Sequence, residues 1–478
     1  MFANPNLAPL SAEIFLLTMA CVVMVVDLFQ KDKQRRLTLW LSQASLFVTL
    51  LLTMQSYGTE KTVLYDGFWV VDNLSIILKS AILIVAMAAL AYAPNYINER
   101  KFLRGEYYML AMFAVLGMLV MVSAHNLLVI YLGLELLSLP LYAMVAMERD
   151  NPKASEAAIK YFVMGALASG FLLYGMSLLY GATQEIGLQA FADALTKLNE
   201  QPLMLKFGVV FIVAGLAFKL GAVPFHMWLP DVYHGAPTSV TLFMGSAPKI
   251  AAFGMLMRLL VDGLSSAITE WQPLLLVLAY LSIALGNVVA ISQWNLKRML
   301  AYSAISHVGY FLMGIIAGNA DGYAASMFYI LVYAVMTLAS FGIIIFLSRA
   351  GFESDRLEDF AGLAKRSPWY AAMTLFTMMS LAGVPPFVGF WPKLEVIMAA
   401  LNAGYVGLAI HAVVFSLIGA YYYLRVAKVM YFDPPSEETP IEANSGLRLL
   451  MSVNGLLMLG LGLVPGWLLA YCLSAFPG

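Results

Sequence analysis

Long apolar runs recur along almost the whole chain, and they restrict its fold more than any other feature. Hydrophobic residues make up 62% of the 478 residues and charged residues only 12%, with a mean hydropathy of +0.82. A run such as Phe15 to Phe29 is continuous and helix-length, whereas a membrane β-barrel needs short strands of alternating hydrophobicity. The sequence therefore predicts an all-α protein that crosses a bilayer many times.

About fourteen segments reach the length of about 20 residues that covers a hydrocarbon core. They lie near 9–29, 38–56, 72–93, 107–123, 127–146, 161–181, 204–228, 238–260, 273–292, 300–317, 324–347, 370–399, 404–430 and 447–470. The first segment lacks a basic stretch and a small-residue cleavage site before it, so we interpret it as a retained helix. The two cysteines offer neither a disulfide framework nor a metal-ligand spacing, and no metal site is predicted.

Basic residues alternate between the two sides of the predicted bundle. Every second linker is rich in lysine and arginine, and together these linkers hold Lys31, Lys33, Arg35, Arg36, Arg100, Lys101, Arg104, Arg149, Lys153, Lys297, Arg298, Arg349, Arg356, Lys365 and Arg366. The intervening linkers hold little beyond Lys61 and Lys197. Because cytoplasmic loops carry the excess of positive charge, this pattern predicts that both termini lie outside the cytoplasm.

Two segments rich in glycine and proline resemble each other. GAVPFHMWLP begins at Gly221 and GVPPFVGFWP at Gly383, a separation of 383 − 221 = 162 residues. The two segments run in opposite directions across the predicted membrane, which indicates an inverted repeat and a transport site between its halves. Proline removes a backbone donor and clashes with the preceding turn, so we expect both spans to break. The predicted break residues are Gly221, Pro224, Pro230, Gly383, Pro385 and Pro386.

Four ionisable residues fall deep within predicted spans: Glu135, Lys219, Lys249 and Lys393. An ionised group near the bilayer centre costs at least about 2.5 kcal/mol, and such residues normally mark ion or proton routes. Carbonyls freed by the first break can stabilise a cation such as Lys219. A lysine can lose and regain a proton beside a movable carboxylate, whereas an arginine cannot. Two structural explanations stay open, a lysine that reaches the interface and a static Glu135–Lys219 pair.

Three histidines extend the predicted proton relay. His226 lies in the first break, His307 lies in AYSAISHVGYF, and His411 lies 411 − 249 = 162 residues after Lys249. Each histidine can also be an ordinary buried residue with satisfied hydrogen bonds, and the sequence alone does not decide between the two roles.

The motifs FHMWLPDVYHGAPTSVT and LKRMLAYSAISHVGY resemble the two signatures of the antiporter-like membrane subunits of respiratory complex I. That family also includes large subunits of Mrp-type sodium/proton antiporters and membrane hydrogenases, and the match extends over nearly the whole chain. The resemblance implies fourteen core helices with two inverted five-helix repeats, each containing a broken helix. The implied divisions are an N-terminal three-helix segment 1–106, halves 107–260 and 273–430, and a C-terminal helix 447–470.

The resemblance also assigns roles to individual residues. Glu135 corresponds to the carboxylate of the fifth span and Lys219 to the lysine of the broken seventh span. Lys249 corresponds to the lysine of the eighth span and Lys393 to that of the broken twelfth span. Lys160 sits where the family often has a further lysine, near the start of the sixth span.

The function implied by this resemblance is proton translocation from cytoplasm to periplasm, driven by quinone reduction elsewhere in an NADH:quinone oxidoreductase. The chain would lie in a bacterial inner membrane with both termini periplasmic. Its partners would be sister antiporter-like subunits and membrane lipids, with no nucleic acid. Flavin, iron-sulfur clusters and quinone would belong to partner subunits, leaving no cofactor here. The alternatives are a self-standing or Mrp-type sodium/proton antiporter subunit and a structural membrane spacer.

The charge pattern makes a prediction about topology. We expect a cysteine introduced near residue 3 or residue 477 to react with a membrane-impermeant thiol reagent in intact spheroplasts, because both ends are predicted to face outward. Labelling of both positions only after lysis would show that the orientation is reversed.

Overall fold

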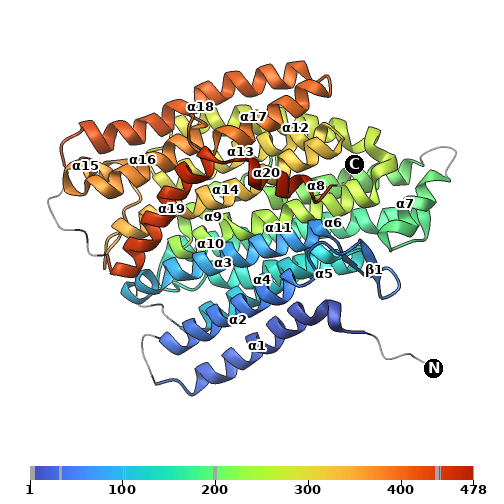
Figure 1. Ribbon diagram of the computed structural model, residues 1–478, viewed down its shortest axis with the longest axis horizontal. Helices are drawn as coiled ribbons and strands as arrows, with labels where there is room; N and C mark the ends of the chain where they lie inside the picture. The colour runs from blue at the N-terminus through green and yellow to red at the C-terminus, as the bar shows by residue number, and fades with distance from the viewer. Residues whose placement is uncertain are drawn as a thin grey trace.

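The computed structural model of the chain is a bundle of long helices, and the predicted all-α, multi-pass fold class is confirmed (Figure 1). It describes residues 6–31, 35–100, 102, 104–197, 202–435, 441 and 443–476. Within these ranges, thirteen helices are long and apolar enough to cross a membrane, and the predicted twelfth span is represented by two shorter helices. Lys33, Lys101 and the labelling positions 3 and 477 lie outside the described residues.

The first part of the chain forms a layer of long helices at one side of the bundle (Figure 1). These elements are η1 (Ala8–Leu10), α1 (Ser11–Leu28), α2 (Arg36–Met54), α3 (Asn73–Glu99), α4 (Gly105–Ser123), α5 (Leu127–Val145) and α6 (Pro152–Thr183). Helix α6 begins nine residues before the predicted span at 161, so Lys160 lies within the helix and not ahead of it.

A small hairpin between α2 and α3 was not predicted. Strands β1 (Thr62–Leu64) and β2 (Trp69–Val71) pair antiparallel, with Thr62 opposite Val71. The Tyr65 hydroxyl donates to the Asn6 carbonyl at 2.6 Å, so the N-terminal segment lies beside this hairpin. The Asn73 amide donates to the Ser474 carbonyl at 3.2 Å. Both described ends of the chain therefore lie at the same end of the bundle as the hairpin (Figure 1).

The middle of the chain contains the first interrupted helix, which is formed by α8 and α9. The elements of this part of the chain are α7 (Leu188–Thr196), α8 (Leu203–Leu220), α9 (Trp228–Gly235), α10 (Thr238–Gly245), α11 (Ala247–Leu256), the π-helical turn η2 (Met257–Gly263) and η3 (Ser265–Ala267). The sequence predicted one continuous span over 238–260. The structure divides it into α10 and α11 at Ser246, whose φ of −107° and ψ of −88° are not helical, and Pro248 then begins a new first turn.

The last part of the chain contains the second interrupted helix and the two C-terminal helices. Its elements are α12 (Ile268–Ile291), α13 (Leu296–Ile316), α14 (Ala320–Leu347), η4 (Leu357–Phe360), α15 (Leu363–Arg366), α16 (Pro368–Ala382), α17 (Phe390–Asn402), α18 (Val406–Phe432), α19 (Ser445–Leu463) and α20 (Gly466–Leu473). The predicted final span 447–470 is wrong as one helix, because it ends before Pro465 and α20 follows.

Burial separates the central helices from the peripheral ones. The most apolar stretch of the segment from Thr238 to Gly263 is 100% buried, and those of α13 and α14 are 94% and 89% buried. The corresponding stretch of α1 is only 28% buried, and α18 and α19 reach 33%. The centre of the bundle is thus formed by α10, α11, α13 and α14, and a side chain within the most apolar stretch of one of these helices is almost always buried.

Helices α12 and α13 approach closely through two glycines. A Cβ atom added at Gly286 would lie 2.6 Å from the backbone nitrogen of Ser306, and one added at Gly309 would lie 2.9 Å from the carbonyl oxygen of Ala279. Real Cβ atoms do not pack this close to backbone, so the helix separation depends on both glycines.

We therefore expect Gly286→Val to lower the stability of the folded protein by about 1–3 kcal/mol, because the two backbones must move apart. The measurement is thermal unfolding of the detergent-solubilised protein. Gly170→Val is the matched control, since a Cβ atom at Gly170 meets nothing within 4 Å. Equal unfolding temperatures for the two variants would contradict the packing described here.

Candidate functional site

The first interruption follows from the glycine that ends α8. Gly221 has a φ of 79°, a left-handed conformation that favours glycine, and its N–H donates to the Ala217 carbonyl at 2.9 Å. The N–H of Ala222 donates to the same carbonyl at 2.8 Å, which completes a glycine-terminated helix end. Residues 221–227 are not α-helical, and α9 begins at Trp228. Pro230 lies in the first turn of α9, where its missing N–H needs no partner, so it is not part of the break.

The second interruption has the same local structure. Gly383 has a φ of 82°, and its N–H donates to the Met379 carbonyl at 3.1 Å. The N–H of Val384 donates to that carbonyl at 3.0 Å. Pro385 and Pro386 follow in the non-helical stretch 383–389, and α17 begins at Phe390. Both breaks thus leave the last carbonyl groups of a helix without a following helical N–H to accept from.

A buried lysine binds these free carbonyls at each break. The Lys249 ammonium, on α11, donates to the carbonyl of Leu220 at 2.5 Å. The Lys393 ammonium, on α17, donates to the carbonyls of Leu381 at 3.1 Å and Ala382 at 3.0 Å. Lys249 is 3% exposed and Lys393 is 8% exposed. A cation at a helix C-terminus is also attracted by the partial negative charge of the helix dipole.

Lys219 does not bind the freed carbonyl, which corrects the expectation from the sequence. Its ammonium donates to the hydroxyl of Ser138 on α5 at 2.9 Å, and the Leu220 carbonyl accepts from Lys249 instead. The reason is direction, because Lys219 projects from α8 toward α5, whereas Lys249 projects from α11 toward the break.

Glu135 lies one turn before Ser138 on α5 and is near enough for its charge to act on Lys219. The two residues form no ion pair among the described side chains, and one carboxylate oxygen of Glu135 is buried without a hydrogen-bond partner. A cavity of about 20 Å³, lined by Ser138 and Lys219, adjoins the contact between these two side chains. That space suffices for a single water molecule, which needs about 10–15 Å³.

His307 belongs to a second polar cluster, around Lys393. Its Nδ1 lies 2.7 Å from the Tyr329 hydroxyl and its Nε2 lies 3.2 Å from the Tyr423 hydroxyl. The Tyr423 hydroxyl lies 2.5 Å from the Ser303 hydroxyl. Lys393 is close enough for its charge to act on His307. The ring is 2% exposed, so both of its nitrogens depend on these protein partners.

The predicted site residues thus divide into two groups. Glu135, Lys219 and Lys249 lie around the first break, with the charge of Lys219 acting on Lys249. His307 and Lys393 lie around the second break. Within the part of the chain that the structure describes, no hydrogen bond joins Lys249 to His307.

Lys160 lies outside both clusters. Its ammonium is 2.8 Å from a carboxylate oxygen of Asp231 and 2.8 Å from one of Glu156, with its side chain 41% exposed. Asp231 also accepts from Arg298 at 2.8 Å. Lys160 therefore belongs to a half-exposed ion-pair network on α6, α9 and α13.

Two of the predicted relay histidines are peripheral. His226 is half-buried in the first break, next to Met227, which is 70% exposed, and its Nδ1 has no partner among the described residues. His411 is half-buried on α18, with its Nε2 3.0 Å from the Tyr280 carbonyl. Neither ring contacts a buried lysine among the described residues.

The sequence reading missed the hydroxyl groups that hold the ionisable side chains. Ser138, Tyr329 and Tyr423 are ordinary residues of apolar helices, and their roles appear only once the helices are packed. One signal was available, because Ser138 follows Glu135 by three residues and must share its helix face.

The reading also missed two buried ion pairs away from the breaks. Lys79 on α3 lies 2.5 Å from Glu13 on α1, and both side chains are nearly inaccessible. Arg258 lies 2.7 Å from Asp72 and 2.8 Å from Asp262 and is 1% exposed. In the sequence, Glu13, Lys79 and Arg258 are charged residues that stand within apolar runs, and this was a usable signal. The described residues contain no group of three or more His, Cys, Asp or Glu that could hold a metal ion.

The fold and these clusters define a polytopic membrane protein in which a buried lysine binds the free carbonyls at each of two helix breaks. Residues 124–419 match the family described as "NADH:quinone oxidoreductase/Mrp antiporter, TM". The chain is 53% identical over 468 residues to NADH-quinone oxidoreductase subunit N of Thiobacillus denitrificans, covering 98% of this chain and 97% of that protein. It is 52% identical over 474 residues to subunit N of Nitrosomonas europaea, covering 99% and 98%.

Two solved structures are similar to this chain over almost its whole length. A chain of respiratory complex I from Thermus thermophilus with bound aureothin is 31% identical, with a TM-score of 0.83, covering 97% of this chain and 100% of that one. A chain of the Mrp complex from Dietzia sp. is 23% identical with a TM-score of 0.84, covering 98% and 96%, and shows the shared fold alone. This chain therefore belongs to the family of NADH-quinone oxidoreductase N subunits, which confirms the resemblance in its motifs.

The Ser138 contact generates a prediction. Ser138→Ala leaves the Lys219 ammonium without its hydroxyl acceptor, at a cost of about 1–3 kcal/mol, and we expect quinone-linked NADH oxidation by host membranes to fall at least severalfold. Ser169→Ala is the control, because Ser169 lines the same small cavity but makes no hydrogen bond to Lys219. Equal activity of both variants, in membranes with equal amounts of assembled complex, would contradict the importance of this contact.

Proposed function

We propose that this chain translocates protons across a bacterial inner membrane as a non-redox subunit of an NADH-quinone oxidoreductase. Protons would move from cytoplasm to periplasm, and quinone reduction in partner subunits would supply the energy. The observation that supports this most is the pair of buried lysines, Lys249 and Lys393, each held by backbone carbonyls at a helix break.

The neutral partners of these lysines suit proton transfer. Among the described residues neither ammonium forms an ion pair with a carboxylate, so releasing the proton strands no buried anion. Burial opposes the charged form, and the helix-end carbonyls support it. A change in a neighbouring charge can then decide whether the lysine holds its proton.

Lys219 is the neighbour placed to make that change. Its charge acts on Lys249, and its ammonium rests on Ser138 with Glu135 one turn away. If Lys219 swings toward Glu135, its repulsion of Lys249 falls and Lys249 can accept a proton. When Lys219 returns, the repulsion rises and the proton leaves toward the second cluster.

The second cluster would complete the route. His307 and Lys393 lie together there, and the hydroxyls of Tyr329 and Tyr423 extend the network on either side of the ring. We infer release from Lys393 to the periplasmic side. Lys160, His226 and His411 lie at the rim of the bundle, and at most they would help protons to enter or leave the route.

Partner subunits are required by the energetics. Moving one charge against 100 mV costs about 2.3 kcal/mol. In the proposed mechanism this chain carries out no redox reaction, so the energy must come from its partners. Flavin, iron-sulfur clusters and quinone would be held elsewhere in the complex, next to sister antiporter-like subunits. The orientation would place both termini in the periplasm, in keeping with the basic linkers.

Two alternatives make different predictions. A self-standing or Mrp-type sodium/proton antiporter subunit would purify without NADH-oxidising subunits and would exchange sodium for protons. A structural spacer would support NADH oxidation and proton pumping even after its buried lysines are neutralised.

The decisive test concerns Lys219. If Lys219 must give up and regain a proton, Lys219→Arg should reduce proton pumping at least about tenfold, nearly as much as Lys219→Ala, since a guanidinium stays protonated. The measurement is quinone-coupled NADH oxidation together with proton pumping in membrane vesicles with confirmed assembly.

Lys206 provides the matched control on the same helix. Its side chain is 48% exposed and its ammonium lies 3.5 Å from Glu270, so Lys206→Arg and Lys206→Ala should both pump normally. An Lys219→Arg variant that pumps like the wild type would overturn the proposed relay and favour a purely electrostatic role.

A further inference from the structure

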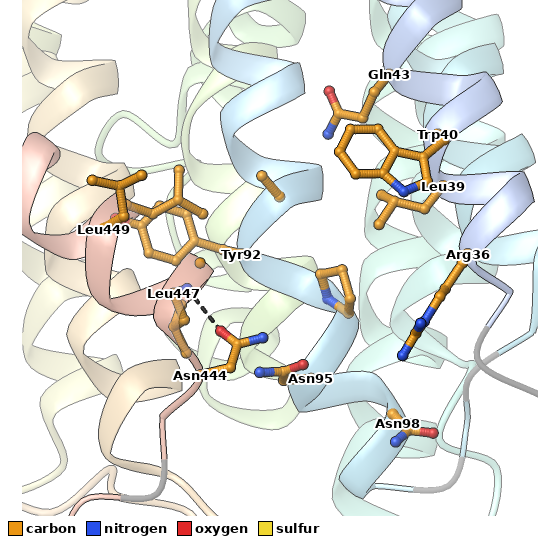
Figure 2. A pocket seen from close by; sticks show the side chains of 14 residues that line it. Arg36, Leu39, Trp40, Gln43, Tyr92, Asn95, Asn98, Asn444, Leu447 and Leu449 are labelled. Carbon is orange, nitrogen blue, oxygen red and sulfur yellow. Dashed lines mark hydrogen bonds between the residues drawn. The ribbon is translucent and has the colours of Figure 1, made fainter.

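A large cavity lies between α2, α3 and α19, away from the lysine clusters. Its volume is about 780 Å³, and it is lined by residues from these three helices and the residues just before α19 (Figure 2). The proposed proton route uses none of its lining residues. The cavity therefore needs an explanation of its own.

One face of α2 forms a wall of this cavity. Arg36, Leu39, Trp40 and Gln43 follow the i, i+3, i+4, i+7 spacing that places side chains on one helix face. Ala91 of α3, which has a short side chain, also lines the cavity.

Polar side chains gather at one end of the cavity. Figure 2 shows Arg36, Asn95, Asn98 and Asn444 near the helix ends, below Trp40 and Leu449 in this view. Asn95 is half-buried and Asn98 is exposed, so a bound group can reach their side-chain amides. The Asn444 side chain uses its oxygen to accept from the Leu447 N–H at 2.8 Å, and its amino group is left for another acceptor.

The rest of the cavity is apolar and opens sideways. Trp40 is 69% exposed and Leu449 is 65% exposed, so both walls of the mouth face the surroundings of the bundle. The Gln43 amide, which also lines the cavity, already donates to the Met87 carbonyl at 2.9 Å. The cavity is thus amphipathic along the direction of the membrane normal, with tryptophan at the level where it is enriched in membrane proteins.

We propose that this cavity binds one anionic phospholipid, with its phosphate at Arg36, Asn95 and Asn98 and its acyl chains against Leu39, Trp40 and Leu449. By the orientation proposed above, the lipid belongs to the cytoplasmic leaflet. Among the described residues that line the cavity Arg36 is the charged one, and its guanidinium can donate to a phosphate oxygen. An apolar helix of another subunit would leave three amides facing it without acceptors, which disfavours that occupant.

Lipid counting on the assembled complex tests the proposal. Ala91→Phe should place a ring inside the cavity and hinder the lipid from entering, and native mass spectrometry of the complex purified in mild detergent should then show the loss of about one phosphatidylglycerol per complex. Arg36→Gln should weaken its retention about fivefold in titrations with phosphatidylglycerol. Arg104→Gln is the control, since Arg104 is an exposed arginine in the linker before α4 and does not line the cavity. Equal retention in all variants would overturn the proposal.

A second measurement does not depend on the Ala91→Phe substitution. A benzophenone amino acid at position 40, photolysed in the intact complex in membranes that contain phosphatidylglycerol, should give an adduct whose added mass is that of this lipid. An adduct with another protein subunit would overturn lipid as the occupant. An adduct with zwitterionic lipid alone would overturn the requirement for an anionic headgroup.

Discussion

The structure depends on a lysine ammonium that binds the free carbonyls of an interrupted helix in the buried, apolar interior of the bundle. A bare carbonyl and an unpaired cation are each costly in that environment, and bringing them together satisfies both. At the first break Lys249 does this for Leu220, and at the second break Lys393 does it for Leu381 and Ala382. The interrupted helices and the buried lysines are therefore one feature, because each makes the other tolerable.

The two breaks use this interaction from different positions in the chain. With the offset of 162 residues, Lys393 corresponds to position 393 − 162 = 231, which is a half-exposed aspartate paired with Lys160 and Arg298. Lys249 corresponds to His411, which lies on the rim. At the first break the lysine comes from α11, and at the second break it comes from α17, which continues the broken span itself. Only the arrangement at the first break joins the broken span to a different span. It also brings Lys249 close enough for the charge of Lys219 to act on it.

The sequence could predict the membrane fold and both interruptions, because glycine and proline act through their own backbone chemistry. It could also single out Glu135, Lys219, Lys249 and Lys393, because charges stand out in apolar spans. It could not predict which lysine meets the Leu220 carbonyl, since that depends on how α8 and α11 are rotated in the bundle. The hydroxyl partners were hidden for the same reason, and the division of the predicted eighth span came from a local conformation at Ser246 that no periodic pattern encodes.

The ion pairs elsewhere in the chain sharpen the interpretation of the lysines at the breaks. Lys79 is locked to Glu13 at 2.5 Å, and Arg258 is held between Asp72 and Asp262. Removing a proton from such a cation leaves a buried anion behind, so these pairs suit a fixed scaffold. Lys249 and Lys393 have neutral carbonyl partners, and losing a proton there costs no such separation. A chain built only as a spacer has no need of two kinds of buried cation, and the difference between them is the physical reason why we propose proton transfer at the breaks.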